Sequence, residues 1–232
     1  MAQRCILASG SPRRREILAH LGLEFEVVVS DADERTGETD PARLSEELSA
    51  RKGHAVRDLL AARGEDVAGK LLIASDTTVF CGGEILGKPR DAADARRMLS
   101  MLSGRRHEVV SGIWLCRDGL EAVSHAVTSV EFAPLTDSEI TSYIASGEPF
   151  GKAGAYAIQG LASSFIRGID GDYFNVVGLP VNRMCDLYRS TFGGELGKTA
   201  RLPENIVRCI YRTTRLTTKS FILLPAIWDS NR

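Results

Sequence analysis

The stretch CILASGSPRRREIL, residues 5–18, decides the fold of this 232-residue chain. Residues 5–8 form a short apolar run that predicts a buried strand, and the small polar residues that follow predict a tight turn. Ser11 suits the N-cap of a helix, and Pro12 suits the first helical position, where no backbone donor is needed. The predicted helix ends at Gly22. Strand, turn and helix in this order are the opening unit of an α/β protein.

The turn at residues 9–11 is also the first candidate binding site. A helix N-terminus presents free backbone N–H groups and the positive end of the helix dipole, which together attract anions. Arg13 and Arg14 follow in the first turn, where the dipole disfavours cations, and their forked donors suit phosphate oxygens. The pattern therefore indicates a phosphate cradle. The alternative from the residues alone is a solvated helix end with surface arginines.

The rest of the chain alternates between strand and helix patterns. Amphipathic helices are predicted over residues 41–63, 91–102 and 180–188, and Thr136 with Glu139 forms a capping box that opens another helix. The predicted strands cover residues 25–29, 71–74, 107–116, 125–132, 160–171 and 173–177, and Gly82-Gly83 predicts a hairpin over residues 79–86. The fold class expected is α/β with one mixed central sheet.

The composition excludes several protein classes. Hydrophobic residues make up 44% of the chain and charged residues 25%, with a formal net charge of -1, as in ordinary globular proteins. No apolar run approaches the roughly 20 residues that cross a bilayer, so no membrane partner is expected. The five cysteines are scattered and form no CxxC pair, which argues against a disulfide framework and a cysteine zinc site. A reducing cytoplasm is the expected location.

Charge divides the chain into two expected parts. Residues 198–232 hold seven Lys or Arg and two acidic residues, whereas the preceding body carries a net negative charge. We therefore expect a domain over residues 1–195 and a basic extension over residues 196–232, which either packs as an accessory element or stays loose. An acidic body has no general attraction for nucleic acid, so no nucleic-acid partner is expected. A phosphate ligand would need a local, organised site.

Two acidic residues and two polar segments are further candidates. Asp76 directly follows a predicted strand, where ligands of open α/β sheets gather, and it could hold a cation or accept a proton from water. Glu34, in an acidic turn, is a possible partner, although taken alone it reads as a solvated loop acid. Lys88, between Gly87 and Pro89, could neutralise a phosphate or mark a surface turn. Gln159, in the small-residue stretch KAGAYAIQG, could read a base edge or belong to a connector.

Five motifs together carry a family resemblance. LASGSPRRREIL, SDTTV, GEILGKPRDAADARRMLSMLSGRRHEV, KAGAYAIQG and GDYFNVVGLP occur in this order over roughly residues 4 to 190. In this respect the chain resembles the Maf nucleoside triphosphate pyrophosphatases. The resemblance implies a two-lobed fold of the Maf and ITPase-like kind, built around a mixed central sheet with a substrate cleft.

The resemblance also implies an activity. Members hydrolyse a nucleoside triphosphate to the monophosphate and diphosphate with a divalent cation, Mg²⁺ or Mn²⁺, in a house-cleaning role. Asp76 would be the catalytic proton acceptor. Arg14, Thr77 and Gln159 match the residues of the dTTP/UTP branch, which also takes modified pyrimidine nucleotides. The other cleft positions that match the family are Ser9, Arg13, Glu34, Lys52, Lys88 and Lys152.

The resemblance leaves alternatives open. A second branch hydrolyses 7-methyl-GTP, and a non-catalytic nucleotide-binding regulator of cell division is a rival of another class. The metal ligands are not assigned by the sequence. A homodimer is compatible with the family.

Overall fold

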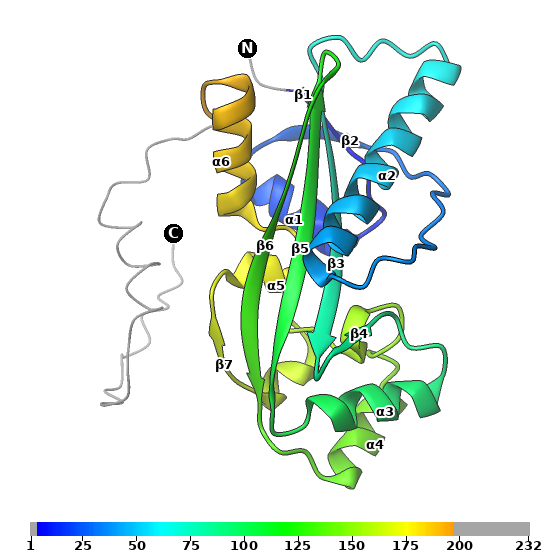
Figure 1. Ribbon diagram of the computed structural model, residues 1–232, viewed down its shortest axis with the longest axis vertical. Helices are drawn as coiled ribbons and strands as arrows, with labels where there is room; N and C mark the ends of the chain where they lie inside the picture. Colours follow the sequence, from blue (N-terminus) through cyan, green and yellow to red (C-terminus); the bar gives the residue numbers. More distant parts are fainter. Residues whose placement is uncertain (1–3, 197–232) are drawn as a thin grey trace, which may run out of the picture. The chain divides into compact units, whose positions relative to one another are not determined.

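The computed structural model describes residues 4–196, which form an α/β structure (Figure 1). The strands are β1 (Arg4–Leu7), β2 (Glu24–Val27), β3 (Leu71–Cys81), β4 (Glu84–Leu86), β5 (Arg106–Arg117), β6 (Leu120–Phe132) and β7 (Ile166–Asp170). The helices are α1 (Pro12–His20), α2 (Pro41–Ala62), α3 (Ala92–Leu102), α4 (Asp137–Ala145), α5 (Tyr173–Val177) and α6 (Val181–Phe192), with short 3₁₀ turns at Ala153–Ala155 and Leu161–Phe165.

The strands form one mixed sheet in the order β2-β1-β3-β5-β6-β7, and β4 pairs with β3. β1 lies parallel to both β2 and β3, whereas the pairs β3–β4, β3–β5, β5–β6 and β6–β7 are antiparallel. This arrangement confirms the predicted fold class. Figure 1 shows α1, α2 and α6 around one half of the long strands, and α3, α4 and β4 around the other half.

The central strands β1, β3 and β5 are buried on both faces of the sheet, and their side chains alternate between these faces. Ile6 and Leu72 point to the face covered by α2, where they pack with Trp114 and Val56. The opposite face holds the larger core, in which strand residues such as Ile73 pack with residues of α1, α3, α4 and α6. Burial on both faces fixes the register, since a shift of one residue would move each side chain to the wrong layer.

Two of the expected strands are wrong in whole or in part. Residues 173–177 form helix α5, whose N-cap Asp172 accepts a hydrogen bond from the Phe174 N–H at 2.8 Å. The β-branched pair Val176-Val177 favours a strand locally. The helix instead buries Asn175, whose amide donates to the Val109 carbonyl of β5. Within residues 160–171 only Ile166–Asp170 is a strand, and Leu161–Phe165 precedes it as a 3₁₀ turn.

Strand β3 differs from the prediction in a way that matters for the site. The expected strand over residues 71–74 and the first arm of the hairpin at residue 79 are one continuous strand, so Asp76 lies inside a strand and not after its end. On one edge, β1 pairs with β3 only as far as Ile73, and β4 begins to pair at Val79. Residues 74–78 therefore lie in a fork of the sheet, where β3 faces a gap between two strands.

The predicted extension over residues 196–232 lies outside the described residues, apart from Leu196. Leu196 is buried in the larger core. Among the helices that the structure describes, none combines the length and the apolar character needed to cross a membrane.

Candidate nucleotide-binding cleft

A cavity of about 850 Å³ opens at the fork of the sheet. Its wall is built by the turn between β1 and α1, the middle of β3, the segment after β4, and the segment before the first 3₁₀ turn. Nine of the ten residues singled out from the sequence line it: Ser9, Arg13, Arg14, Glu34, Lys52, Asp76, Thr77, Lys88 and Lys152. Gln159 is exposed and does not line this cavity.

Asp76 and Glu34 share one ammonium group at the cavity wall. Lys52, on α2, donates from Nζ to Asp76 Oδ1 and lies 3.0 Å from Glu34 Oε1. Lys88 approaches the other Glu34 oxygen at 3.7 Å. The Asp76 side chain is only 13% exposed, whereas the Lys88 side chain is 62% exposed. The four connected charged groups therefore extend from a shielded carboxylate, Asp76, to a solvent-exposed cation, Lys88.

The lysines keep Glu34 ionised. Burial opposes ionisation of this carboxyl, but the hydrogen bond and charge of Lys52, with the weaker contributions of Lys88, outweigh it and hold the pKa of Glu34 below its ordinary value. Glu34 is a loop acid with a side chain that is 47% exposed, and it contacts two cations at the cavity.

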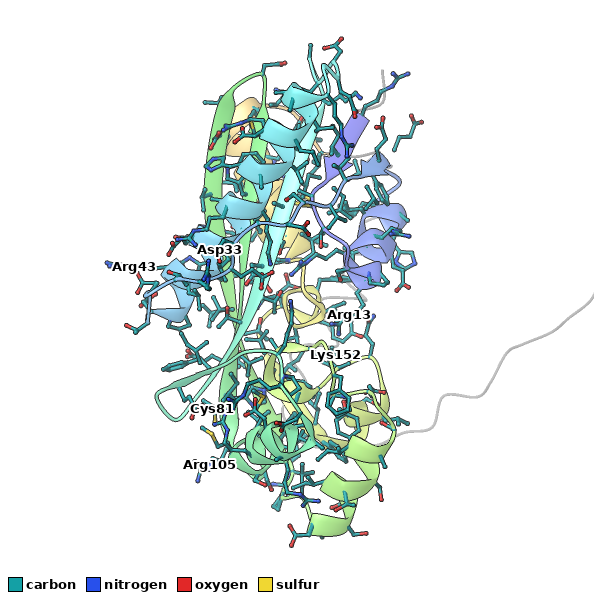
Figure 2. The ribbon with its side chains drawn as sticks, turned by 90° about the vertical axis from the view of Figure 1, so that its right-hand side faces the viewer. Arg13, Asp33, Arg43, Cys81, Arg105 and Lys152 are labelled. Carbon is teal, nitrogen blue, oxygen red and sulfur yellow. The ribbon has the colours of Figure 1, made fainter. Side chains whose placement is uncertain are left out.

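Arg13 and Lys152 face each other across the cavity without a carboxylate partner. Figure 2 shows the two side chains approaching from α1 and from the segment before the first 3₁₀ turn. Burial, and then the positive charge of Arg13, lower the pKa of Lys152, and Glu148 offsets only part of this effect. Among the described residues, no carboxylate lies within ion-pairing distance of either cation. Two facing cations of this kind form a site that a bound anion would stabilise.

Arg14 has a different position from Arg13. Its guanidinium donates from Nε to the Gly178 carbonyl at 2.7 Å, from Nη1 to Ser9 Oγ at 3.1 Å, and from Nη2 to Thr77 Oγ1 at 3.0 Å. It therefore ties the turn after β1 to β3 and to the end of α5. Such bonds fix the cavity wall, because a planar guanidinium holds its partners in a set geometry.

The turn before α1 leaves its helix end open. Ser11 occupies the N-cap position with extended backbone angles, as predicted, but its side chain makes no capping bond, and its N–H donates to Ser9 Oγ at 3.2 Å. The first turn of α1 contains no acidic residue. The N–H groups of this turn thus border the cavity beside Arg13, in the arrangement expected of an anion site.

Sequence reasoning did not select two buried serines behind the cavity wall. Ser75 donates to the Gly178 carbonyl at 3.1 Å, and Ser111 lies 2.9 Å from Thr77 Oγ1. Ser111 is 34 residues from Thr77 and becomes its neighbour only through the pairing of β3 with β5. The only local signal for Ser111 is a polar residue inside an apolar strand, and Ser75 is the first of four consecutive polar residues in β3. Such a signal does not identify a partner.

The acidic residues of the cavity are too few to hold a metal ion by themselves. Among the described residues, no group of three or more His, Cys, Asp or Glu side chains converges. Asp76 and Glu34 nevertheless suit Mg²⁺, which proteins commonly bind through one or two carboxylates together with phosphate oxygens of the substrate. The donor chemistry therefore fits a cation that arrives with a polyphosphate.

The cavity lies within the part of the chain that matches a known family. The model of the family described as "Maf-like protein" matches residues 4–191, which include every residue of the cavity. The chain belongs to this family. Its relatives include proteins named dTTP/UTP pyrophosphatase from Symbiobacterium thermophilum, 47% identical over 80% of this chain and 92% of the relative, and from Chromobacterium violaceum, 48% identical over 83% and 96%. A third, from Geotalea uraniireducens, is 50% identical over 79% and 93%.

Among solved structures, the Ham1 protein of Staphylococcus aureus is similar over 92% of this chain and 100% of its own, with 17% identity and a TM-score of 0.43. Membership of the Maf-like family rests on the sequence matches, which cover both walls of the cleft. It confirms the resemblance that the five motifs indicated.

Proposed function

We propose that this Maf-like protein is a nucleoside triphosphate pyrophosphatase that hydrolyses dTTP and UTP to the monophosphate and diphosphate. The names of relatives that are 47–50% identical over about four fifths of the chain support this substrate class. The cleft supports it independently, because it combines a polyphosphate-binding surface with a shielded carboxylate. Modified pyrimidine nucleotides belong to the same proposed range, in a house-cleaning role.

The observation that carries the proposal is the charge of the cavity wall. Five cations and two carboxylates line it, so its charge is strongly positive although the whole chain is close to neutral. Among the described residues, Arg13, Arg14 and Lys152 have no carboxylate within ion-pairing distance, and Arg14 donates to uncharged oxygens instead. A triphosphate carries several negative charges along its length, and bringing it between these cations relieves their mutual repulsion.

Asp76 is the residue best placed to act on water. Its carboxylate lies at the fork of the sheet, on the cavity wall, and Lys52 holds it by a hydrogen bond. In the proposed step, Asp76 accepts a proton from a water molecule as the water oxygen forms a bond to the α-phosphorus. The bond from the α-phosphorus to the bridging oxygen breaks, and the diphosphate leaves with that electron pair. The cations around the cavity stabilise the charge that develops on the phosphate oxygens.

A divalent cation fits this site as a substrate partner, with Asp76 and Glu34 as the protein carboxylates that would hold it. When bound, it would neutralise phosphate charge and polarise the phosphoryl group. Lys52, which lies between both carboxylates, holds them in place before the substrate binds.

The reducing cytoplasm is the proposed compartment. Cys81, Cys116 and Cys185 are free thiols, and Cys81 and Cys116 are buried. Cysteines remain as thiols in a reducing compartment, where disulfides rarely form.

The test is diphosphate release from a nucleotide panel by Asp76→Asn and the wild type, with Mg²⁺ or Mn²⁺ present. The wild type should prefer dTTP and UTP over 7-methyl-GTP and purine nucleotides. Loss of a general base lowers the rate by a factor on the order of 10² to 10⁴, and Asp76→Asn should lose at least that lower value with an unchanged melting temperature. Asp58→Asn, on the exposed side of α2, is the matched control. Near-normal diphosphate release by Asp76→Asn would reject the assignment.

A further inference from the structure

The segment that connects β2 to α2, residues 28–40, brings Glu34 to the cavity and contains no helix or strand. A segment of this kind depends for its shape on the bonds that side chains make to its backbone. The Glu34 side chain contacts Lys52 and Lys88, but it is open to solvent and stands on this irregular backbone. The position of its carboxylate therefore depends on what holds the backbone around Glu34.

Arg51 of α2 binds the backbone on both sides of Glu34. Its Nη1 group donates to the carbonyl oxygen of Asp33 at 3.2 Å and to that of Arg35 at 2.7 Å. Figure 2 shows Asp33 beside α2. A guanidinium is planar and its donors are fixed relative to one another, so it sets the positions of the oxygens that it binds. The residues before and after Glu34 are thereby attached to the helix.

Glu47 completes this attachment one helical turn before Arg51. Arg51 Nη2 donates to Glu47 Oε1, and the other carboxylate oxygen of Glu47 accepts from Thr36 Oγ1 at 3.0 Å. Residues four apart lie on the same face of a helix, which allows both side chains to reach the segment together. Lys52, the next residue after Arg51, contacts the Glu34 carboxylate. One part of α2 therefore holds the backbone around Glu34 as well as its side chain.

We propose that Arg51 is a positioning residue, which together with Glu47 fixes residues 33–36 so that Glu34 meets the divalent cation of the substrate complex. This inference rests on the proposed function, in which Glu34 is one of the carboxylates that hold that cation. Arg51 and Glu47 do not line the cavity, so they act on the substrate through Glu34. A segment that is already fixed loses less conformational freedom when the ligand binds, which strengthens binding.

A purely structural role of the Arg51–Glu47 pair predicts a different result. Both side chains are partly exposed, and an exposed ion pair one helical turn apart adds little to stability. Such a pair would have no effect on cation binding in the cavity. A positioning role instead predicts weaker cation binding when the pair is broken, although every residue of the cavity remains.

The test measures Mn²⁺ affinity by calorimetry in the presence of α,β-methylene-UTP, in which a methylene group replaces the bridging oxygen of the bond to be cleaved. Arg51→Met should weaken Mn²⁺ binding about tenfold, which corresponds to one hydrogen bond of about 1.4 kcal/mol. The value of kcat/KM for UTP should fall by a similar factor. Arg57→Met is the matched control, since Arg57 lies on the same helix, is equally exposed at 39%, and pairs with Glu121 outside the cavity.

A double-mutant cycle with Glu34→Gln decides whether Arg51 acts through Glu34. Glu34→Gln alone should weaken Mn²⁺ binding, and the addition of Arg51→Met should then change the affinity by less than about twofold, because two residues that act as one unit are not additive. An undiminished effect of Arg51→Met in the double variant would overturn the inference, because it would show that the lost charge acts directly. Wild-type affinity in Arg51→Met or in Glu34→Gln, or an equal fall in Arg57→Met, would also overturn it.

The outcomes separate this inference from the proposed function. A wild type that releases diphosphate from no nucleotide rejects the function, whereas the Mn²⁺ affinities need no turnover and still decide the role of Arg51. A wild type that does not bind Mn²⁺ with the analogue overturns the inference. If Arg51→Met does not fold, Thr36→Val provides the decision, since it removes only the bond to Glu47 and keeps the shape of the side chain. A fall in its Mn²⁺ affinity supports the inference, and wild-type affinity overturns it.

Discussion

Gly112 allows α2 to lie directly against the sheet beside Asp76, and its replacement by alanine tests how closely fold and site are coupled. Gly112 is the cross-strand partner of Asp76 in the β3–β5 pair. A Cβ atom at this position would lie 2.0 Å from the backbone oxygen of Ser45 on α2. Real Cβ contacts hardly fall below 3.0 Å, so the helix must move by about 1 Å. Lys52 lies two helical turns beyond Ser45, on the same face of α2, and would move with it.

The expected cost of Gly112→Ala is at the upper end of about 1–3 kcal/mol for an overpacked core, because a backbone atom cannot rotate aside. A chain of this length loses about 2–4 °C per kcal/mol, so we expect a fall in melting temperature of roughly 6–12 °C. Displacement of a site residue by about 1 Å can reduce the rate about 10²-fold, because Lys52 would no longer hold Asp76.

Thermal unfolding and diphosphate release from UTP measure the two effects of Gly112→Ala in the same preparation. Gly168→Ala, in β7, is the control, since nothing lies within 4 Å of its added Cβ atom. A Gly112→Ala protein with the wild-type melting temperature would refute the close approach of helix and sheet. A large loss of stability with full activity at low temperature would refute the coupling of α2 to the site.

Two further predictions concern a cation and a buried histidine. Lys152→Met should raise KM for UTP about tenfold or more through loss of a charged contact, while Arg15→Met, an exposed change on α1 outside the cavity, should leave steady-state kinetics unchanged. Burial lowers the pKa of His107 from 6.5 to about 4. As the pH falls, the His107 imidazole is therefore protonated in the unfolded chain before it is protonated in the folded protein, which favours unfolding. The free energy of unfolding should fall by about 2 kcal/mol between pH 8 and pH 5. His107→Gln, which can still pair with Tyr156, should lack that loss in urea unfolding; an equal loss would exclude His107 as its source.

The local elements were largely predictable because their signals are local. Ser11-Pro12 marks the start of α1, the Gly82-Gly83 pair turns β3 into β4, and Thr136 with Glu139 closes the capping box of α4. Each depends on residues within one turn of chain. The positive cleft was predictable in part for the same reason, since its arginines stand beside a helix N-terminus that the sequence itself specifies.

The elements that were predicted wrongly are those whose conformation depends on contacts between residues far apart in the sequence. Tyr173–Val177 has the residues of a strand but forms a helix, because Asn175 gains buried hydrogen bonds from β5 and β6 in that conformation. Asp76 was expected at a strand end, yet β3 continues, and only the departure of β1 and the arrival of β4 open the fork in which Asp76 lies. Gln159 belongs to the same motif as Lys152 but is exposed outside the cavity.

By itself, then, the sequence determined the α/β class and the residue types that bind phosphate, since periodicity, capping and turn chemistry act between near neighbours. The tertiary structure decided which of those residues meet. Lys52 reaches Asp76 from 24 residues away on another element, and Ser111 reaches Thr77 across a strand pair. Such contacts depend on the register of the sheet and on how closely a helix packs against it. Both are set by burial of the whole core, so the local sequence around each residue does not predict them.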